Sequence, residues 1–105
     1  DVLPDDQKLV IEIGKVIRHG YLQQNAFHKD DTYVPLEKQN HMMEVILYLY
    51  QKAKHFVEEG KSLNLLTETG IFDQVIKMKY DVPNDNLEMF DQYFKNIDKI
   101  IKRIK

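Results

Sequence analysis

The sequence predicts an all-α protein, a helical bundle of about four to five helices that are mostly antiparallel. Apolar residues recur at alternating steps of three and four along most of the chain, which is the periodicity of helices with one buried face. No stretch combines strict alternation with turn residues, as strands do. The connectors between the periodic stretches are short, and short connectors favour antiparallel neighbours. A chain of 105 residues fits one domain, residues 1–105.

The first helix is expected to begin near Pro4, because a proline followed by Asp5 and Asp6 is typical of a first helical turn. It should end near Gly20. Its predicted core face consists of Leu9, Ile13, Val16, Ile17 and Tyr21. The periodicity then lapses over residues 21–34, which indicates a connector.

The second helix is expected from Pro35, a suitable first helical residue, to Gly60, since glycine commonly follows a helix end. Its predicted core face consists of Met43, Ile46, Tyr50, Ala53 and Val57, widened by Met42, Leu49 and Phe56. After it we expect a short helix at about residues 63–66, a break at Gly70 and another helix at about residues 71–79.

The last helix shows the strongest pattern of one buried stripe. Pro83 marks the break before it, and Asp85 with Glu88 indicates a variant of the capping box. The predicted stripe is Leu87, Phe90, Phe94, Ile97, Ile101 and Ile104. The basic residues at its end complement the negative end of the helix dipole.

The composition excludes several classes of function. The chain has no cysteine, which removes thiol nucleophiles, thiolate zinc sites and iron–sulfur clusters. Its net charge is -2 and its pI is near 6.1, so its overall field does not recruit nucleic acid or an anionic membrane surface. No apolar run approaches the ~20 residues of a membrane span. The chain begins at Asp1 without an initiator methionine, which suggests processing or excision from a longer polypeptide.

Neither a catalytic site nor a metal site is indicated. The glycines do not cluster as a phosphate-binding loop requires. Glu37, His41 and Glu44 share one face of the second helix, but a metal-binding bundle needs Glu-x-x-His pairs on other helices, and none occurs. A solvated charged face explains these three residues better. Ser62 is the only serine, and helix capping explains it better than a nucleophilic role.

The connector carries two aromatic residues, Phe27 and Tyr33. Such a residue is either a core anchor or a surface on which a ligand ring stacks. Spacing alone favours the anchor for Phe27. The hydroxyl of Tyr33 adds a capping or local hydrogen-bonding role to the same two interpretations.

Three strings in and after the connector are distinctive: YLQQNAF at residues 21–27, DTY at 31–33 and PLEKQ at 35–39. In this order they resemble the C-terminal helical domain of the catalytic A subunit of V/A-type (archaeal or vacuolar-type) rotary ATPases and ATP synthases. The resemblance extends from residue 1 to about residue 80, and the last helix agrees mainly in pattern. The opening string DVLPDDQKL also resembles the acidic DELSEED segment of the related F-type beta subunit.

The resemblance implies a fragment of a larger subunit, whose nucleotide-binding domain with its P-loop, catalytic glutamate and magnesium ligands lies upstream. The full subunit would bind ATP or ADP with Mg²⁺ and couple ATP hydrolysis or synthesis to rotation of the central stalk and to proton or sodium transport. The fragment alone would be inactive and hold no cofactor. The implied partners are the B subunit and the central stalk subunits. The implied location is the cytoplasmic, soluble head, peripheral to the membrane, without membrane insertion or nucleic acid.

Residue matching carries two of the family's sites onto this chain. The adenine pocket falls on Phe27, with Asn25 and Ala26 beside it and Tyr33 at its edge. The segment implied to face the rotor consists of Asp1, Val2, Leu3, Pro4, Asp5 and Asp6. Because valine at position 2 and Gln7 replace acidic residues of the family pattern, we expect a steric lever rather than an electrostatic push. The aspartates equally suit the positive end of a helix dipole.

Two alternatives from other functional classes stay open. One is a free-standing helical protein-interaction module, whose exposed face recruits a partner helix. Such a module would have no P-loop domain in the same reading frame. The other is a small metal-dependent enzyme, which would contain stoichiometric metal when purified.

Overall fold

The computed structural model describes residues 3–22 and 34–104. These residues form helices and no β-strand, which confirms the predicted all-α class. The α-helical elements are α1 (Asp5–Val16), α2 (Leu36–Glu58), α3 (Leu63–Thr67), α4 (Ile71–Ile76), α5 (Met78–Asp81) and α6 (Phe90–Ile104). A π-helical segment, η1 (Ile17–Leu22), continues α1, and a 3₁₀ turn, η3 (Leu87–Met89), precedes α6.

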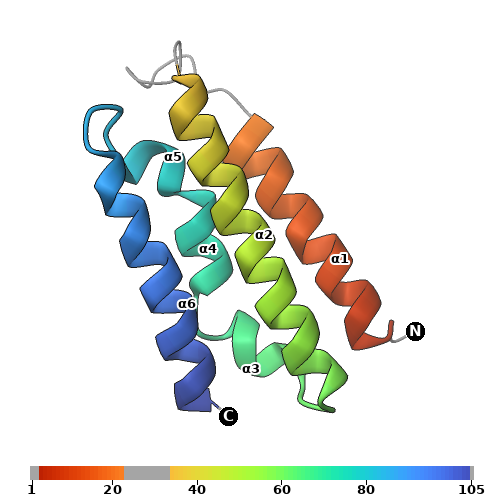
Figure 1. Ribbon diagram of the computed structural model, residues 1–105. Helices are drawn as coiled ribbons and strands as arrows, with labels where there is room; N and C mark the ends of the chain where they lie inside the picture. The colour runs from red at the N-terminus through yellow and green to blue at the C-terminus, as the bar shows by residue number, and fades with distance from the viewer. Residues whose placement is uncertain (1–2, 23–33, 105) are drawn as a thin grey trace.

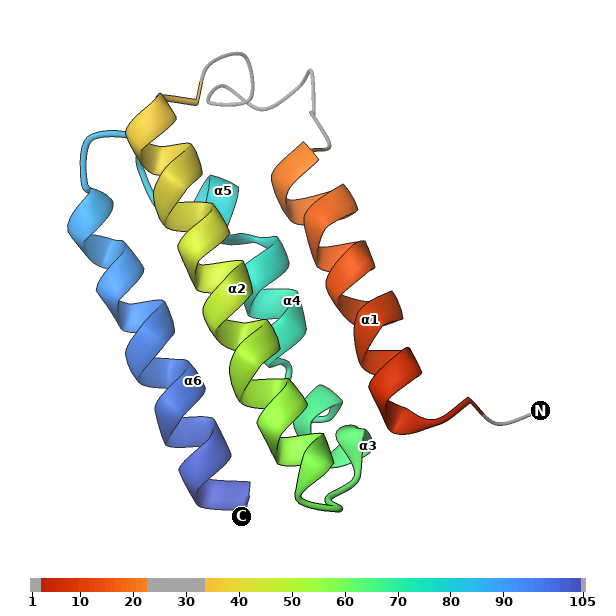
Figure 2. The same ribbon diagram turned by 45° about the vertical axis from the view of Figure 1, so that its right-hand side comes forward.

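The four longer elements pack side by side and alternate in direction along the chain (Figures 1 and 2). The chain runs up α1, down α2, up through α4 and α5, and down α6. Helix α2 contacts both α1 and α6, and α4 also contacts both of them. Neighbours are therefore antiparallel in the pairs α1–α2 and α4–α6, and parallel in the pairs α1–α4 and α2–α6. The molecule measures 41 × 29 × 19 Å.

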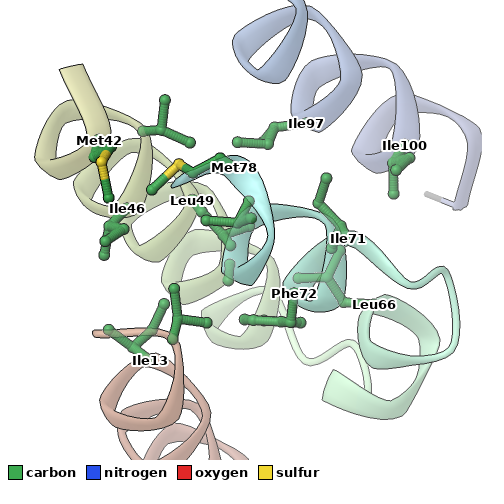
Figure 3. Packing of buried hydrophobic residues seen from close by; sticks show 14 of the residues in the cluster. Ile13, Met42, Ile46, Leu49, Leu66, Ile71, Phe72, Met78, Ile97 and Ile100 are labelled. Atoms are coloured by element: carbon green, nitrogen blue, oxygen red, sulfur yellow. The ribbon is translucent and has the colours of Figure 1, made fainter. Parts of the chain in front are cut away.

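The core lies between these helices, and α2 supplies the largest share of it. Figure 3 shows Met42, Ile46 and Leu49 of α2 pointing toward Met78 of α5 and toward Ile97 of α6. The buried residues of α2 are Lys38, Met42, Val45, Ile46, Leu49, Ala53 and Phe56. Each of the apolar members is at most 1% exposed, and burying a large aliphatic side chain contributes about 1.5–3 kcal/mol.

The buried face of α2 is centred differently from the prediction. The pattern places Met43, Tyr50 and Val57 on the core face, but all three are only half-buried. The core side instead includes Val45, which the predicted face omits. Because α2 is covered by α1 on one side and by α6 on the other, its apolar arc is wide, and its centre depends on neighbours that the pattern does not contain.

The first helix follows its prediction closely. Leu9, Ile13 and Val16 are buried, and Ile17 and Tyr21 pack against the core from η1. Regular α-helix ends at Val16, and the chain continues as a π-helical turn through the predicted end. This segment carries its residues past the end of α4, which it contacts.

The segment between α2 and α6 contains three short helices. Ser62 caps α3 as predicted, its Oγ accepting the backbone N–H of Asn64 at 3.2 Å. Gly60 and Gly70 have φ of 90° and 82°, in the left-handed region that favours glycine, and they separate α2, α3 and α4. The predicted helix over residues 71–79 is divided at Lys77 into α4 and α5.

The beginning of the last helix differs from the prediction. Asn86 stands at the N-cap of η3 without a side-chain capping bond, and regular helix begins only at Phe90. The capping box predicted from Asp85 and Glu88 therefore precedes the α-helix rather than starting it. The buried residues of α6 are Phe90, Ile97 and Ile100, and the predicted stripe omits Ile100.

Candidate functional site

The residues predicted to form an adenine pocket lie outside the described residues. These residues are Asn25, Ala26, Phe27 and Tyr33. Asp1 and Val2 of the predicted rotor-facing segment lie outside them as well. The assignments of these six residues stay predictions, and the structure places only what flanks them.

The described part of the rotor-facing segment forms the entry to α1. Leu3 is 42% exposed, and the carbonyl of Pro4 accepts the backbone N–H groups of Gln7 and Lys8, both at 3.0 Å. Asp5 and Asp6 occupy the first turn, where a carboxylate stabilises the helix dipole. The turn presents an exposed apolar side chain beside two carboxylates.

The two aspartates of this turn have different environments. The Oδ2 of Asp5 accepts the backbone N–H of Leu63 at 2.9 Å, which satisfies one of the N–H groups at the start of α3 that have no partner within the helix. Asp5 therefore links α1 to α3. The Oδ1 of Asp6 accepts the N–H of Gln7 at 2.9 Å, and the residue is exposed. Of the two, Asp6 is the carboxylate that is available to a partner.

The opposite end of the molecule carries a buried lysine that the sequence pattern does not single out. The start of α2, the end of η1 and α5 lie together at this end (Figure 2). Lys38, in the first turns of α2, is 0% exposed. Its Nζ donates to the carbonyls of Lys79 at 2.7 Å and Val82 at 2.6 Å, and to the Oδ1 of Asn84 at 2.8 Å.

This arrangement satisfies the ammonium group completely. A lysine Nζ has three N–H donors, and three oxygen acceptors lie within hydrogen-bond distance. Two of the acceptors are carbonyls at the C-terminal end of α5, where the helix dipole is negative and the last carbonyls lack partners within the helix. Lys38 therefore joins the beginning of α2 to the chain that leaves α5.

A signal for Lys38 is nevertheless present in the sequence. Position 38 lies four and seven residues before Met42 and Val45, so helical spacing places it on the buried face. A lysine at such a position is almost never buried unless it is paired. The pairing groups lie 41 to 46 residues further along the chain, and the pattern gives no indication of them.

Gly20 forms a second close contact at the same end. It is buried in η1, and a Cβ at this position would lie 2.9 Å from the Cα and 3.0 Å from the carbonyl oxygen of Ile76. Real Cβ atoms do not approach backbone so closely, so only glycine fits this crossing without a shift. By contrast, a Cβ on Gly14 would meet nothing within 4 Å.

An apolar groove of about 300 Å³ lies between α1 and α2. Val10 and Leu47 on its walls are 58% and 51% exposed. Ile17, Met43 and Tyr50 complete most of the lining. The groove contains no ionisable side chain other than a tyrosine, so it has no groups for acid–base chemistry at neutral pH.

The ionisable groups of the described residues support no metal site and no membrane span. No group of three or more histidine, aspartate or glutamate side chains in residues 3–22 and 34–104 is placed to hold a metal ion. His41 instead contacts Glu44, with Nδ1 3.3 Å from Oε1, and stacks on Phe90. Within the same ranges, no helix has the length and apolar character that crossing a membrane requires.

One tyrosine has a strongly shifted pKa. The hydroxyl of Tyr48 on α2 donates to Oδ1 of Asp98 on α6 at 2.5 Å. This hydrogen bond, together with burial and the carboxylate charge, raises the pKa of Tyr48 to about 12. The contact joins two parallel helices on the surface and has no nucleophile or base beside it that would indicate catalysis.

Comparison with known families identifies the domain. The family described as the C-terminal domain of V and A type ATP synthase matches residues 1–66, which is more than half of the chain. The chain belongs to this family. The matched region of the V/A-type C-terminal domain includes the acidic first turn, the connector and all of α2.

Several relatives extend the similarity of this V/A-type domain to its last helix. The V-type ATP synthase alpha chain 2 of Clostridium tetani is 45% identical over 87 residues, covering 83% of this chain. The V-type ATP synthase alpha chain of Halothermothrix orenii is 38% identical over 104 residues, or 99% of the chain. The A subunit of the A-type ATP synthase of Methanopyrus kandleri is 36% identical over 100 residues, or 94%. The chain spans only 15 to 18% of the length of these three relatives.

Proposed function

We propose that the chain is the C-terminal helical domain of the catalytic A subunit of a V/A-type ion-translocating ATPase or ATP synthase. In the full subunit it couples ATP hydrolysis or synthesis to rotation of the central stalk, and it contributes Phe27 to the adenine pocket. Its partners are the B subunit and the central stalk subunits of the soluble, peripheral head. The observation that carries this proposal is the family match over residues 1–66.

The arrangement of the helices supports a mechanical role. The residues that flank the connector lie at one end of the molecule, and the entry to α1 lies at the other (Figure 1). Helix α2 joins the two ends with 23 residues, or about 34 Å at 1.5 Å per residue. Because its buried face packs against both α1 and α6, a displacement at the nucleotide end moves the whole bundle rather than bending one helix.

The contact with the rotor is steric in this proposal. Leu3 and Asp6 are the exposed side chains at the entry to α1, whereas Asp5 is engaged in capping α3. One available carboxylate in the described part of this segment contributes little against a screened partner charge. The tip therefore acts by shape, with the first turn of α1 braced against α3.

The nucleotide itself is held elsewhere. Among the described residues there is no cluster of acidic groups for Mg²⁺, and the four glycines of the chain form no phosphate loop. When bound to the full subunit, ATP supplies the driving free energy. This domain offers the purine a ring to stack on, which contributes about 1–3 kcal/mol.

The test is the Phe27→Ala variant of the full-length protein, assembled in its complex. We expect its affinity for ATP to fall roughly 5- to 150-fold, the equivalent of one lost stacking interaction. Phe27→Tyr keeps the ring and is the matched control, with an affinity close to that of the wild type. Equilibrium nucleotide titration measures both, and an unchanged affinity in Phe27→Ala would count against the proposal.

A protein-interaction module is the second candidate, and the apolar groove between α1 and α2 favours it. The groove leaves Val10 and Leu47 open to solvent within the described residues, and such a surface suits an amphipathic partner helix. The upstream gene sequence separates the two candidates. A P-loop domain in the same reading frame supports the ATPase assignment, and its absence supports the module.

A further inference from the structure

The two described ends of the connector are each fixed by close contacts. On the N-terminal side, Gly20 of η1 is buried and lies so near the backbone of Ile76 that no Cβ fits between them. Tyr21 follows it and packs against the core. This end of the connector therefore has little freedom to move relative to the end of α4.

On the C-terminal side, Val34 packs against the core, and its carbonyl accepts the Nε2 of Gln39 at 2.9 Å. One turn into α2, the buried ammonium of Lys38 binds the two carbonyls and the amide oxygen at the end of α5. Hydrogen bonds to a charged donor are about twice as strong as neutral ones. This end of the connector is therefore fixed relative to α5 and the turn after it.

Both contacts end on the same short piece of chain. Gly20 touches Ile76, the last residue of α4, and Lys38 binds the backbone at Lys79 and Val82 and the side chain of Asn84. We call residues 76–84 the anchor segment. Figures 1 and 2 show α5, the main helix of this segment, beside the upper ends of α1 and α2.

We propose that Gly20 and Lys38 are positioning residues for the nucleotide site, acting through the anchor segment. This inference rests on the proposed function, in which the connector between them presents Phe27 to the purine. By fixing both flanks to one segment, the two residues set where the stacking ring stands, and neither of them touches the nucleotide. Misplacement of a binding group by about 1 Å already weakens its contribution.

The experiment uses the full-length protein assembled in its complex and measures KM for ATP separately from kcat. The variants are Gly20→Ala, which forces the flank away from Ile76, and Asn84→Ala, which removes one acceptor of Lys38 without leaving a backbone carbonyl unpaired. Gly14→Ala is the matched control, because a Cβ at position 14 meets nothing within 4 Å. Phe27→Ala is measured in parallel.

We expect KM to rise roughly three- to tenfold in Gly20→Ala and Asn84→Ala, less than in Phe27→Ala, where the whole stacking interaction is lost. We expect kcat to stay within about twofold of the wild type, because lost uniform binding raises KM alone. Gly14→Ala should change neither. A merely structural role would reduce the fraction of active enzyme and so lower the apparent kcat while leaving KM unchanged.

The outcomes separate this inference from the proposed function. If Phe27→Ala raises KM while Gly20→Ala and Asn84→Ala leave it unchanged, positioning is refuted and the adenine contact stands. If Phe27→Ala itself leaves KM unchanged, both are refuted. Failure of Gly20→Ala to fold leaves the decision to Asn84→Ala, which changes a partly buried side chain.

Discussion

Replacing Lys38 by methionine tests the energetic role of the buried ammonium group. Methionine has a similar length and no branch at Cβ, so it keeps much of the packing of the lysine stem and removes only the charge and its three donors. The carbonyls of Lys79 and Val82 then lose the donor that the structure gives them at 2.7 and 2.6 Å. The change isolates the hydrogen bonds from the volume they occupy.

The magnitude follows from the two carbonyls. A buried acceptor left without a donor costs about 1–3 kcal/mol. The substitution also removes the desolvation cost of a buried charge, which offsets part of that loss. We expect a net decrease of about 2–4 kcal/mol in the free energy of unfolding. Since each kcal/mol shifts Tm by about 4–5 °C in a domain near 100 residues, this corresponds to roughly 8–20 °C.

Thermal and urea unfolding of the 105-residue chain, followed by circular dichroism, measures the effect. Lys95→Met is the matched control, because Lys95 is exposed on α6 and surface substitutions usually change stability by no more than about 0.5 kcal/mol. The urea midpoint should fall with an unchanged m value. A loss below about 1 kcal/mol, or one equal to that of Lys95→Met, would refute the assignment of Lys38 as a capping cation.

Three further predictions concern stability and titration. Gly20→Ala should destabilise the chain by about 1–3 kcal/mol through the clash with backbone, while Gly14→Ala should stabilise it by up to about 1 kcal/mol in thermal unfolding; equal effects would contradict the close contact. Asp5→Ala should cost about 1 kcal/mol through the lost cap on α3, read from the urea midpoint, and no loss would contradict that cap. The raised pKa of Tyr48 stabilises the fold fully below pH 10, and this contribution is lost as pH rises toward 12. Asp98→Asn should lower the Tyr48 pKa in an NMR titration, and an unchanged value would exclude the hydrogen bond as its main cause.

Local sequence signals predict the elements of this fold well where one face decides the outcome. Leu9, Ile13 and Val16 follow one stripe and are buried as expected, because α1 is covered from one direction. Ser62 caps α3 because a short hydroxyl side chain before a helix binds the N–H groups that the first turn leaves open. These features depend on residues within one or two turns of each other.

Features that depend on distant parts of the chain were not predictable in this way. The acceptors of Lys38 are 41 to 46 residues away, so a buried cation cannot be told from a solvated one until α5 is placed. The division of α4 from α5 at Lys77 has no glycine or proline to mark it. For the candidate site, the motif predicts Phe27 by resemblance alone, because neither helical period nor capping rules apply within a connector.

The sealed position of Lys38 also gives the domain an internal chemical reporter. A primary amine reacts with an acylating reagent only when the reagent can reach it, and this one is out of reach while α2 rests on the end of α5. Its modification rate, read by mass spectrometry beside that of a surface lysine, measures how often the first turns of α2 separate from α5. In a working motor, nucleotide-dependent opening at that end would register as a change in this rate, without any added probe.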